Sequence, residues 1–99
     1  MRIISRAALR NFWQQYPEAE SSLRMWYKVA KKAGWENIMD TRTDFPHADF
    51  VGVCTIFNIS GNNYRLVTKI YYPAKKVLIR FVLTHAEYNK KPYKNDCEC

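Results

Sequence analysis

Apolar residues in the first third of the chain repeat at helical spacing and predict two amphipathic helices. The first stripe is Leu9, Phe12, Trp13 and Tyr16, and the second is Ala19, Leu23, Trp26, Tyr27 and Ala30. Ser5 is the expected N-cap of the first helix, Pro17 begins the second and Gly34 ends it. Residues 1–4 form a short apolar run that predicts an edge strand. We expect the aromatic residues of both stripes to pack in the core.

From Phe50 onward the apolar pattern changes to the alternation of β-strands. We expect strands at residues 50–59, 64–72 and 77–84. Gly61-Asn62 is a hairpin signal, and a turn at 73–76 joins the last two strands. Residues 35–49 have no clear period and predict a loop, with at most a short strand or a turn of helix. The pattern predicts an α+β domain in which two helices pack on one face of a small antiparallel sheet (β-α-α-β-β-β), followed by a short helical turn at 86–90.

The two turns define a strand register and divide the sheet into two faces. In this register Ile59 lies opposite Tyr64, and Lys69 lies opposite Arg80. The face expected to meet the helices carries Val53, Thr55, Phe57, Ile59, Leu66, Thr68, Ile70, Val77, Ile79, Phe81 and Leu83. The other face carries Cys54, Ile56, Asn58, Arg65, Val67, Lys69, Tyr71, Leu78, Arg80, Val82 and Thr84.

The second face gathers three cations. Lys69, Arg80 and Arg65 would repel one another across the strands, which is a cost unless an anion binds among them. A phosphate is one such anion. The alternatives are that the side chains extend into solvent or that acidic loop residues, such as Asp44 or Asp49, neutralise them. The register alone leaves these interpretations about equally supported.

Composition sets the broad class. With 99 residues the chain predicts a single domain, 1–99, and its 16 Lys and Arg against 9 Asp and Glu give a net charge of +7. This balance favours an anionic partner such as nucleic acid. We expect no membrane segment, no secretory signal and therefore a cytoplasmic protein.

The three cysteines, Cys54, Cys97 and Cys99, lack the spacing of a disulfide framework or a metal site. We expect no metal and no cofactor, and a flexible basic tail over residues 90–99 with exposed thiols.

Two segments resemble the HigB toxins of type II toxin–antitoxin systems, within the RelE/ParE-like group. The first is the hairpin Gly61-Asn62-Asn63-Tyr64-Arg65-Leu66, and the second runs from Ile79 through Thr84-His85-Ala86-Glu87 to Tyr88. The N-terminal strand and two helices are also similar to that family. The resemblance implies a RelE-like fold and a ribosome-dependent endoribonuclease, an mRNA interferase that cleaves mRNA in the A site. It also implies a HigA-like helix-turn-helix antitoxin as partner, and operator DNA binding only through that antitoxin.

Such cleavage needs a base for the 2′-hydroxyl, stabilisation of the phosphorane and an acid for the 5′-oxygen. We predict Arg65, Lys69, Arg80 and His85 as catalytic residues that act without a metal. The arginines offer forked donors, Lys69 offers a charge or a base, and histidine exchanges protons near neutral pH. The predicted RNA- or ribosome-binding residues are Asn58, Tyr88, Lys90, Lys91 and Lys94.

Two other functions are compatible with these residues. One is a ParE-like toxin of the same fold that inhibits a DNA topoisomerase without cutting nucleic acid. The other is a non-catalytic RNA-binding domain. The chain also carries Asn89 where many relatives are expected to have Asp, which we expect to affect the last helical turn more than the chemistry.

Overall fold

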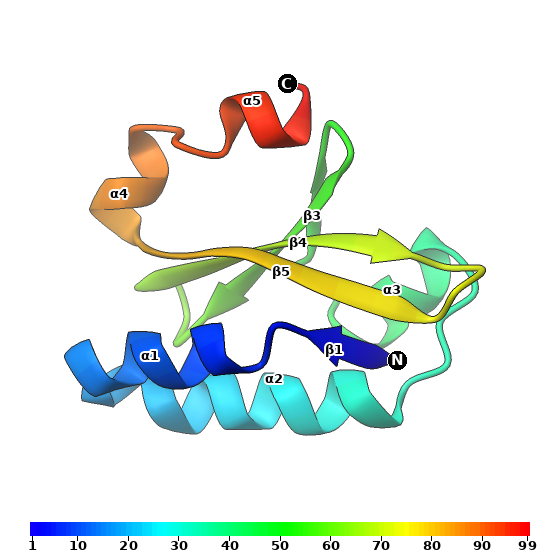
Figure 1. Ribbon diagram of the computed structural model, residues 1–99, viewed down its shortest axis with the longest axis horizontal. Coiled ribbons are helices and arrows are strands. Elements are labelled where there is room, and N and C mark those ends of the chain that lie inside the picture. The colour runs from blue at the N-terminus through cyan, green and yellow to red at the C-terminus, as the bar shows by residue number, and fades with distance from the viewer.

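The sheet organises the molecule, which the computed structural model describes over residues 1–99 (Figure 1). In chain order the elements are β1 (Arg2–Ile4), α1 (Ala7–Gln15), a 3-10 turn η1 (Pro17–Ala19), α2 (Glu20–Lys32), α3 (Ile38–Asp44), β2 (Asp49–Val51), β3 (Cys54–Ile59), β4 (Tyr64–Tyr71), β5 (Lys76–Thr84), α4 (His85–Asn89) and α5 (Lys94–Cys97). The strands form one sheet in the order β1-β5-β4-β3-β2. The predicted antiparallel meander is confirmed, and β1 is an edge strand that pairs parallel to β5.

Helices α1 and α2 lie along one face of this sheet, as predicted, while α4 and α5 lie on the other side (Figure 1). The main core between α1, α2 and the sheet contains Leu9, Phe12, Leu23, Trp26, Trp35, Phe57, Ile59, Leu66, Val77 and Ile79 among its buried residues. A second, smaller cluster lies on the opposite face and contains Cys54, Ile56, Val67, Leu83, Tyr93 and Cys97. The domain therefore buries apolar side chains on both faces of its sheet.

The ends of the first two helices follow the sequence only in part. Pro17 begins a helical turn as expected, and α2 ends at Lys32, just before Gly34. The expected N-cap is wrong, because α1 begins after Arg6 and no side chain caps it. The N-terminal ammonium of Met1 donates to the carbonyls of Ala30, Lys31 and Ala33. This contact places positive charge at the carbonyl end of α2, where the helix dipole favours it.

The segment expected to be mainly a loop contains α3. The Asn37 side chain accepts a hydrogen bond from the Asp40 amide at 2.9 Å and caps this helix. The Trp35 indole donates to Asp44 at 2.8 Å and packs near Phe57, which anchors the segment to the core. The strand expected at 50–59 is two strands, β2 and β3, because Gly52 turns the backbone with a positive φ of 57°.

A β-bulge in β5 and a shifted turn before it change the predicted register of the last two strands. The hairpin between β3 and β4 is as predicted, with Ile59 opposite Tyr64. In the next pair, however, Thr68 faces Ile79 and Val67 faces Phe81, so Arg80 is an extra residue without a partner in β4. On the turn side of the bulge, Tyr71 faces Lys76, so the turn spans residues 72–75 and the predicted turn at 73–76 is wrong by one position. This shift places Lys69 opposite Leu78, and the prediction that it faces Arg80 is wrong.

The bulge also exchanges the faces of the residues beyond it. Phe81 and Leu83, predicted to meet the helices, pack in the second cluster, and Val82 packs against the main core instead. Val53, another predicted core residue, is half-exposed between β2 and β3.

The prediction of a flexible tail at 90–99 is wrong. Cys97 is fully buried and forms a disulfide with Cys54, while Tyr93 is 4% exposed. The Val53 amide donates to the Cys97 carbonyl at 2.9 Å. A β-carbon on Gly52 would lie 1.9 Å from that carbonyl oxygen, so only glycine allows this approach. Of the three cysteines, Cys99 alone is a free thiol, and it is exposed.

The contact between η1 and the hairpin predicts a pH-dependent stability. The Tyr64 hydroxyl donates to the Glu18 carboxylate, which raises the pKa of Tyr64 to about 12 and lowers the pKa of Glu18. Because the pKa of Glu18 is lower in the folded than in the unfolded protein, the contact stabilises the fold at pH values above the unfolded-state pKa. This stability is lost as the pH falls through the folded-state pKa. We expect Tyr64→Phe to lower the free energy of unfolding at pH 7 and to have less effect near pH 3, as measured by urea unfolding at both pH values. An equal loss of unfolding free energy at both pH values would contradict the coupling between Tyr64 and Glu18.

Candidate functional site

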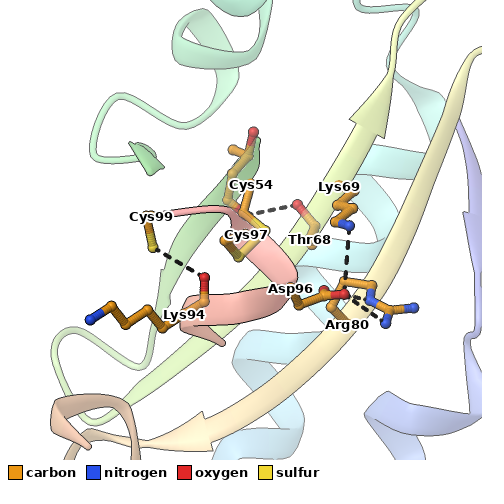
Figure 2. Close-up of a disulfide and its surroundings, with 9 residues drawn as sticks. Cys54, Thr68, Lys69, Arg80, Lys94, Asp96, Cys97 and Cys99 are labelled. Carbon is orange, nitrogen blue, oxygen red and sulfur yellow. Dashed lines mark hydrogen bonds and ion pairs between the residues drawn. A yellow bond between two sulfur atoms is a disulfide. The ribbon is translucent and has the colours of Figure 1, made fainter. Parts of the chain in front are cut away.

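Three residues from different elements form an ionic cluster on the sheet face opposite α1 and α2 (Figure 2). Arg80 donates from Nε and Nη2 to the two carboxylate oxygens of Asp96, at 2.7 and 3.0 Å. Lys69 Nζ lies 3.5 Å from the same carboxylate. Arg80 is the bulged residue of β5, and Asp96 belongs to α5. The cluster therefore brings together two predicted site residues and one acid that was not predicted.

The carboxylate neutralises much of the charge of the two cations. The hydrogen bond from Arg80 is the largest cause that lowers the pKa of Asp96. Desolvation opposes this effect, and the charges of Arg80 and Lys69 add to it. In turn the hydrogen bond to Asp96 raises the pKa of Arg80. The side chains are 39% exposed for Arg80, 21% for Lys69 and 22% for Asp96, so the cluster lies at the surface and an ion can reach it. The idea that an acid balances these cations is correct, but the acid is Asp96 and not Asp44 or Asp49.

A second group lies where β4 begins and β5 ends. The guanidinium of Arg65 sits 5.2 Å from the ring centroid of Tyr88 and donates to the carbonyls of Asn62 and Tyr64. His85 is exposed at the start of α4, one residue beyond Thr84, which pairs with Tyr64. Asn58 pairs with Arg65 across the β3–β4 ladder. The structure thus gathers Arg65, His85, Tyr88 and Asn58 at one end of the sheet.

Local hydrogen bonds orient this second group. The Thr84 hydroxyl accepts from the Glu87 amide and the Glu87 carboxylate accepts from the Thr84 amide, which is a capping box. The His85 amide also donates to the Asn63 carbonyl at 3.0 Å. These bonds connect α4 to the β3–β4 hairpin, so the backbone of His85 is held although its side chain is exposed.

The four predicted catalytic residues do not meet at one point. Arg65 and Lys69 are four residues apart on β4, about 13 Å along an extended strand. Arg80 lies on β5 and His85 directly follows its end, five positions further on, about 16 Å along an extended strand. The site is therefore a basic strip with two positions, one at Arg65 and His85 and one at Lys69 and Arg80.

The predicted basic tail continues from this strip as an ordered segment. Lys90, Lys91 and Lys94 are all exposed, and Lys94 begins α5. Behind them Tyr88 stacks on Tyr93, with ring centroids 5.0 Å apart. Burial, together with the neighbouring Tyr88, raises the pKa of Tyr93 to about 12. The lysines add positive charge beside the Arg65 group.

Asp96, Tyr93 and the Cys54–Cys97 disulfide are the parts of this region that the sequence did not reveal. Their signal was weak, because cysteines 43 residues apart have no diagnostic spacing. Side-chain atoms of Cys54, Asp96 and Cys97 lie within 4.8 Å of one another. The two sulfur atoms are bonded to each other and so lack the thiolate charge of a metal ligand, and Asp96 is engaged by Arg80 and Lys69.

No helix of the protein has the length and apolar character that a membrane span requires. Its fold and its basic sheet face define a small RelE-like α+β protein. A family model described as HigB_toxin, the RelE-like toxic component of a toxin–antitoxin system, matches residues 19–91. The chain belongs to this family of toxins.

Individual relatives agree with this assignment. The chain is 29% identical over 93 residues to the "mRNA interferase HigB" of Escherichia coli O6:H1, an alignment that covers 91% of the chain and 90% of the relative. It is 27% identical over 92 residues to the "mRNA interferase toxin HigB" of Escherichia coli K12, which covers 90% and 88%. The "mRNA interferase HigB" of Shigella flexneri matches to the same extent.

Proposed function

We propose that the protein is a ribosome-dependent endoribonuclease that cleaves mRNA in the A site and thereby stops translation. The observation that carries this proposal is the basic strip, in which the structure assembles Arg65, His85 and Tyr88 at one end and Lys69 and Arg80 further along. The relatives named as mRNA interferases, aligned over nine-tenths of the chain, support the same activity.

The spacing of the strip suggests separate tasks for its two ends. The scissile phosphate binds at Arg65 and His85. There the imidazole exchanges protons with the 2′-hydroxyl or the leaving 5′-oxygen, and Arg65 stabilises the charge that develops on the phosphorane. We assign Tyr88 to contact with a base, in exchange for one of its present neighbours Tyr93 and Arg65, and Asn58 to a hydrogen bond with the RNA. Attack by the 2′-hydroxyl on the adjacent phosphate needs no metal, and we propose that none takes part.

Lys69 and Arg80 bind a second phosphate of the same RNA strand. Their α-carbons lie about 13–16 Å along the strands from those of the first group. The Lys69 and Arg80 side chains also turn to Asp96, whereas Arg65 turns to Asn62, so we assign the two groups to different phosphates. A guanidinium binds a phosphate through parallel hydrogen bonds, and lysine adds a point charge. Lys90, Lys91 and Lys94 extend the positive surface toward ribosomal RNA.

The partners follow from the family. We propose a HigA-like helix-turn-helix antitoxin that neutralises the toxin, with operator DNA bound only through that antitoxin. The targets, mRNA and the ribosome, place the protein in the cytoplasm.

The first test is to map 5′ ends on a defined messenger with purified ribosomes, with and without the protein. We expect new ends inside A-site codons, which do not form without ribosomes. Lys28→Ala removes one exposed charge from α2, on the other side of the molecule, and should leave the pattern unchanged. An intact messenger in cells whose growth the protein arrests would contradict the proposal and direct attention to DNA topoisomerases.

Arg80→Ala should lower the efficiency of cleavage by roughly 10- to 100-fold, the loss expected for one charge-assisted group on a substrate anion. Because the second phosphate does not react, the change should appear mainly in KM. Arg80→Lys keeps the positive charge but lacks the paired N–H donors of the guanidinium, so it should recover only part of the lost cleavage efficiency. A normal KM for Arg80→Ala would exclude this residue from RNA binding.

A further inference from the structure

The C-terminal segment covers the basic strip at the position where the second phosphate is expected. Figure 2 shows Asp96 between Lys69 and Arg80, directly before the cysteine that is joined to Cys54. The carboxylate uses two of the five Arg80 donors and approaches Lys69. An RNA phosphate would need the same donors, because carboxylate and phosphate bind the guanidinium fork in the same way.

We propose that the Cys54–Cys97 disulfide is a redox-controlled clasp that holds Asp96 on Arg80 and Lys69, and that its reduction uncovers these cations for RNA. The inference rests on the proposed function for its consequence, since the uncovered cations would bind the substrate. The disulfide would then have a role in control as well as in stability. Residues 91–99 would cover part of the basic strip until the disulfide is reduced.

The contacts of the segment show why the covalent bond decides its position. Helix α5 has only four residues, which is too short to be stable alone. The ion pairs of Asp96 lie at the surface, where such pairs contribute little. The other anchors are the buried Tyr93, its stacking on Tyr88 and one backbone hydrogen bond from Val53 to Cys97. The disulfide is the one covalent bond that joins this end of the chain to β3.

The chemistry of the switch is thiol–disulfide exchange with a dithiol. Because Cys54 is 2% exposed and Cys97 is fully buried, the C-terminal segment must first open locally to admit the reductant. The first thiolate of the dithiol then attacks one sulfur and releases the other cysteine as a thiol. The second thiolate then closes the cyclic disulfide of the reductant and releases the remaining cysteine. Two electrons and two protons pass to Cys54 and Cys97. Disulfides in reducing compartments are typically transient or redox-sensing, which agrees with a control function for this bond.

The experiment compares the oxidised protein, the same protein after dithiothreitol and the double variant Cys54→Ser/Cys97→Ser. Every sample carries Cys99→Ser, so that the free thiol is absent from all of them alike. Mass spectrometry verifies the redox state. Binding of a short 2′-O-methyl RNA, which cannot be cleaved by 2′-hydroxyl attack, measures access to the strip. Hydrogen–deuterium exchange measures release of residues 91–99.

We expect the reduced protein and the serine variant to bind this RNA at least about fivefold more tightly than the oxidised protein, the lower end of typical coupling between sites. Exchange over 91–99 should rise in both. Asp96→Asn in the oxidised protein should recover part of the affinity, because it removes the competing charge while the clasp stays closed. If the serine variant fails to fold, the dithiothreitol and Asp96→Asn comparisons still test the clasp.

Equal RNA affinity and equal exchange in the oxidised and reduced proteins would overturn the clasp, whatever the enzyme does. On ribosomes we expect reduction to lower KM with little change in kcat. If neither redox form cleaves mRNA while the affinity and exchange still differ, the nuclease proposal fails and the clasp stands.

Discussion

His85→Ala should lower the rate of mRNA cleavage on ribosomes by about 10²–10⁴-fold, the contribution typical of a general acid or base. We propose the most direct role in the strip for His85, because it is exposed at the start of α4, directly after Thr84, which pairs with Tyr64 at the end of the sheet that carries Arg65. The loss should appear in kcat, since removing a proton-transfer group affects the transition state more than RNA binding. Single-turnover cleavage of a defined messenger measures it.

Two controls separate this loss from misfolding and from loss of charge. His47→Ala removes the other histidine, which is exposed in the turn before β2, and should have no effect. His85→Ala itself should unfold at a similar temperature, because the contacts of residue 85 that the structure records are made by its backbone. A variant that retains more than about a tenth of the wild-type rate would remove His85 from the chemistry and favour a different proton carrier in the strip.

The sequence predicted the fold class because its periodicities are local and strong. The stripes of α1 and α2 and the alternation of β3 and β4 each lie within one element, so the pattern identifies the element without knowledge of the rest of the chain. The Gly61-Asn62 signal also gave the correct pairing of Ile59 with Tyr64. Family membership then confirmed the RelE-like toxin suggested by the motifs around Arg65 and His85.

What the sequence did not predict depends on contacts between distant segments. The bulge at Arg80 shifts the register, and an inserted residue is not visible in an alternating pattern that continues on both sides of it. Residues 91–99 are joined to the sheet through Cys97 and Cys54, which are 43 positions apart, so no local pattern indicates that the tail is ordered. Candidate cations were found, yet their division into two groups and the presence of Asp96 needed the structure.

The exchange of faces at the bulge leads to a prediction about stability. Phe57 is 1% exposed and packs against the rings of Trp26, Trp35 and Phe45, at centroid distances of 5.4, 6.3 and 5.0 Å. Phe81 is half-buried against the smaller cluster. Phe57→Ala should therefore lower the free energy of unfolding by about 3–5 kcal/mol, and Phe81→Ala by less than about 3 kcal/mol, because a half-exposed ring leaves a smaller cavity.

Urea unfolding of both variants with the disulfide intact tests this order, and equal m-values make the two free energies comparable. The same substitution on two strands of one sheet, β3 and β5, removes the same atoms, so the difference between the variants reports burial. If the continuous register without a bulge were correct, Phe81 would face α1 and α2 and its replacement would cost as much as that of Phe57. A loss for Phe81→Ala equal to or larger than that for Phe57→Ala would thus contradict the bulge in β5.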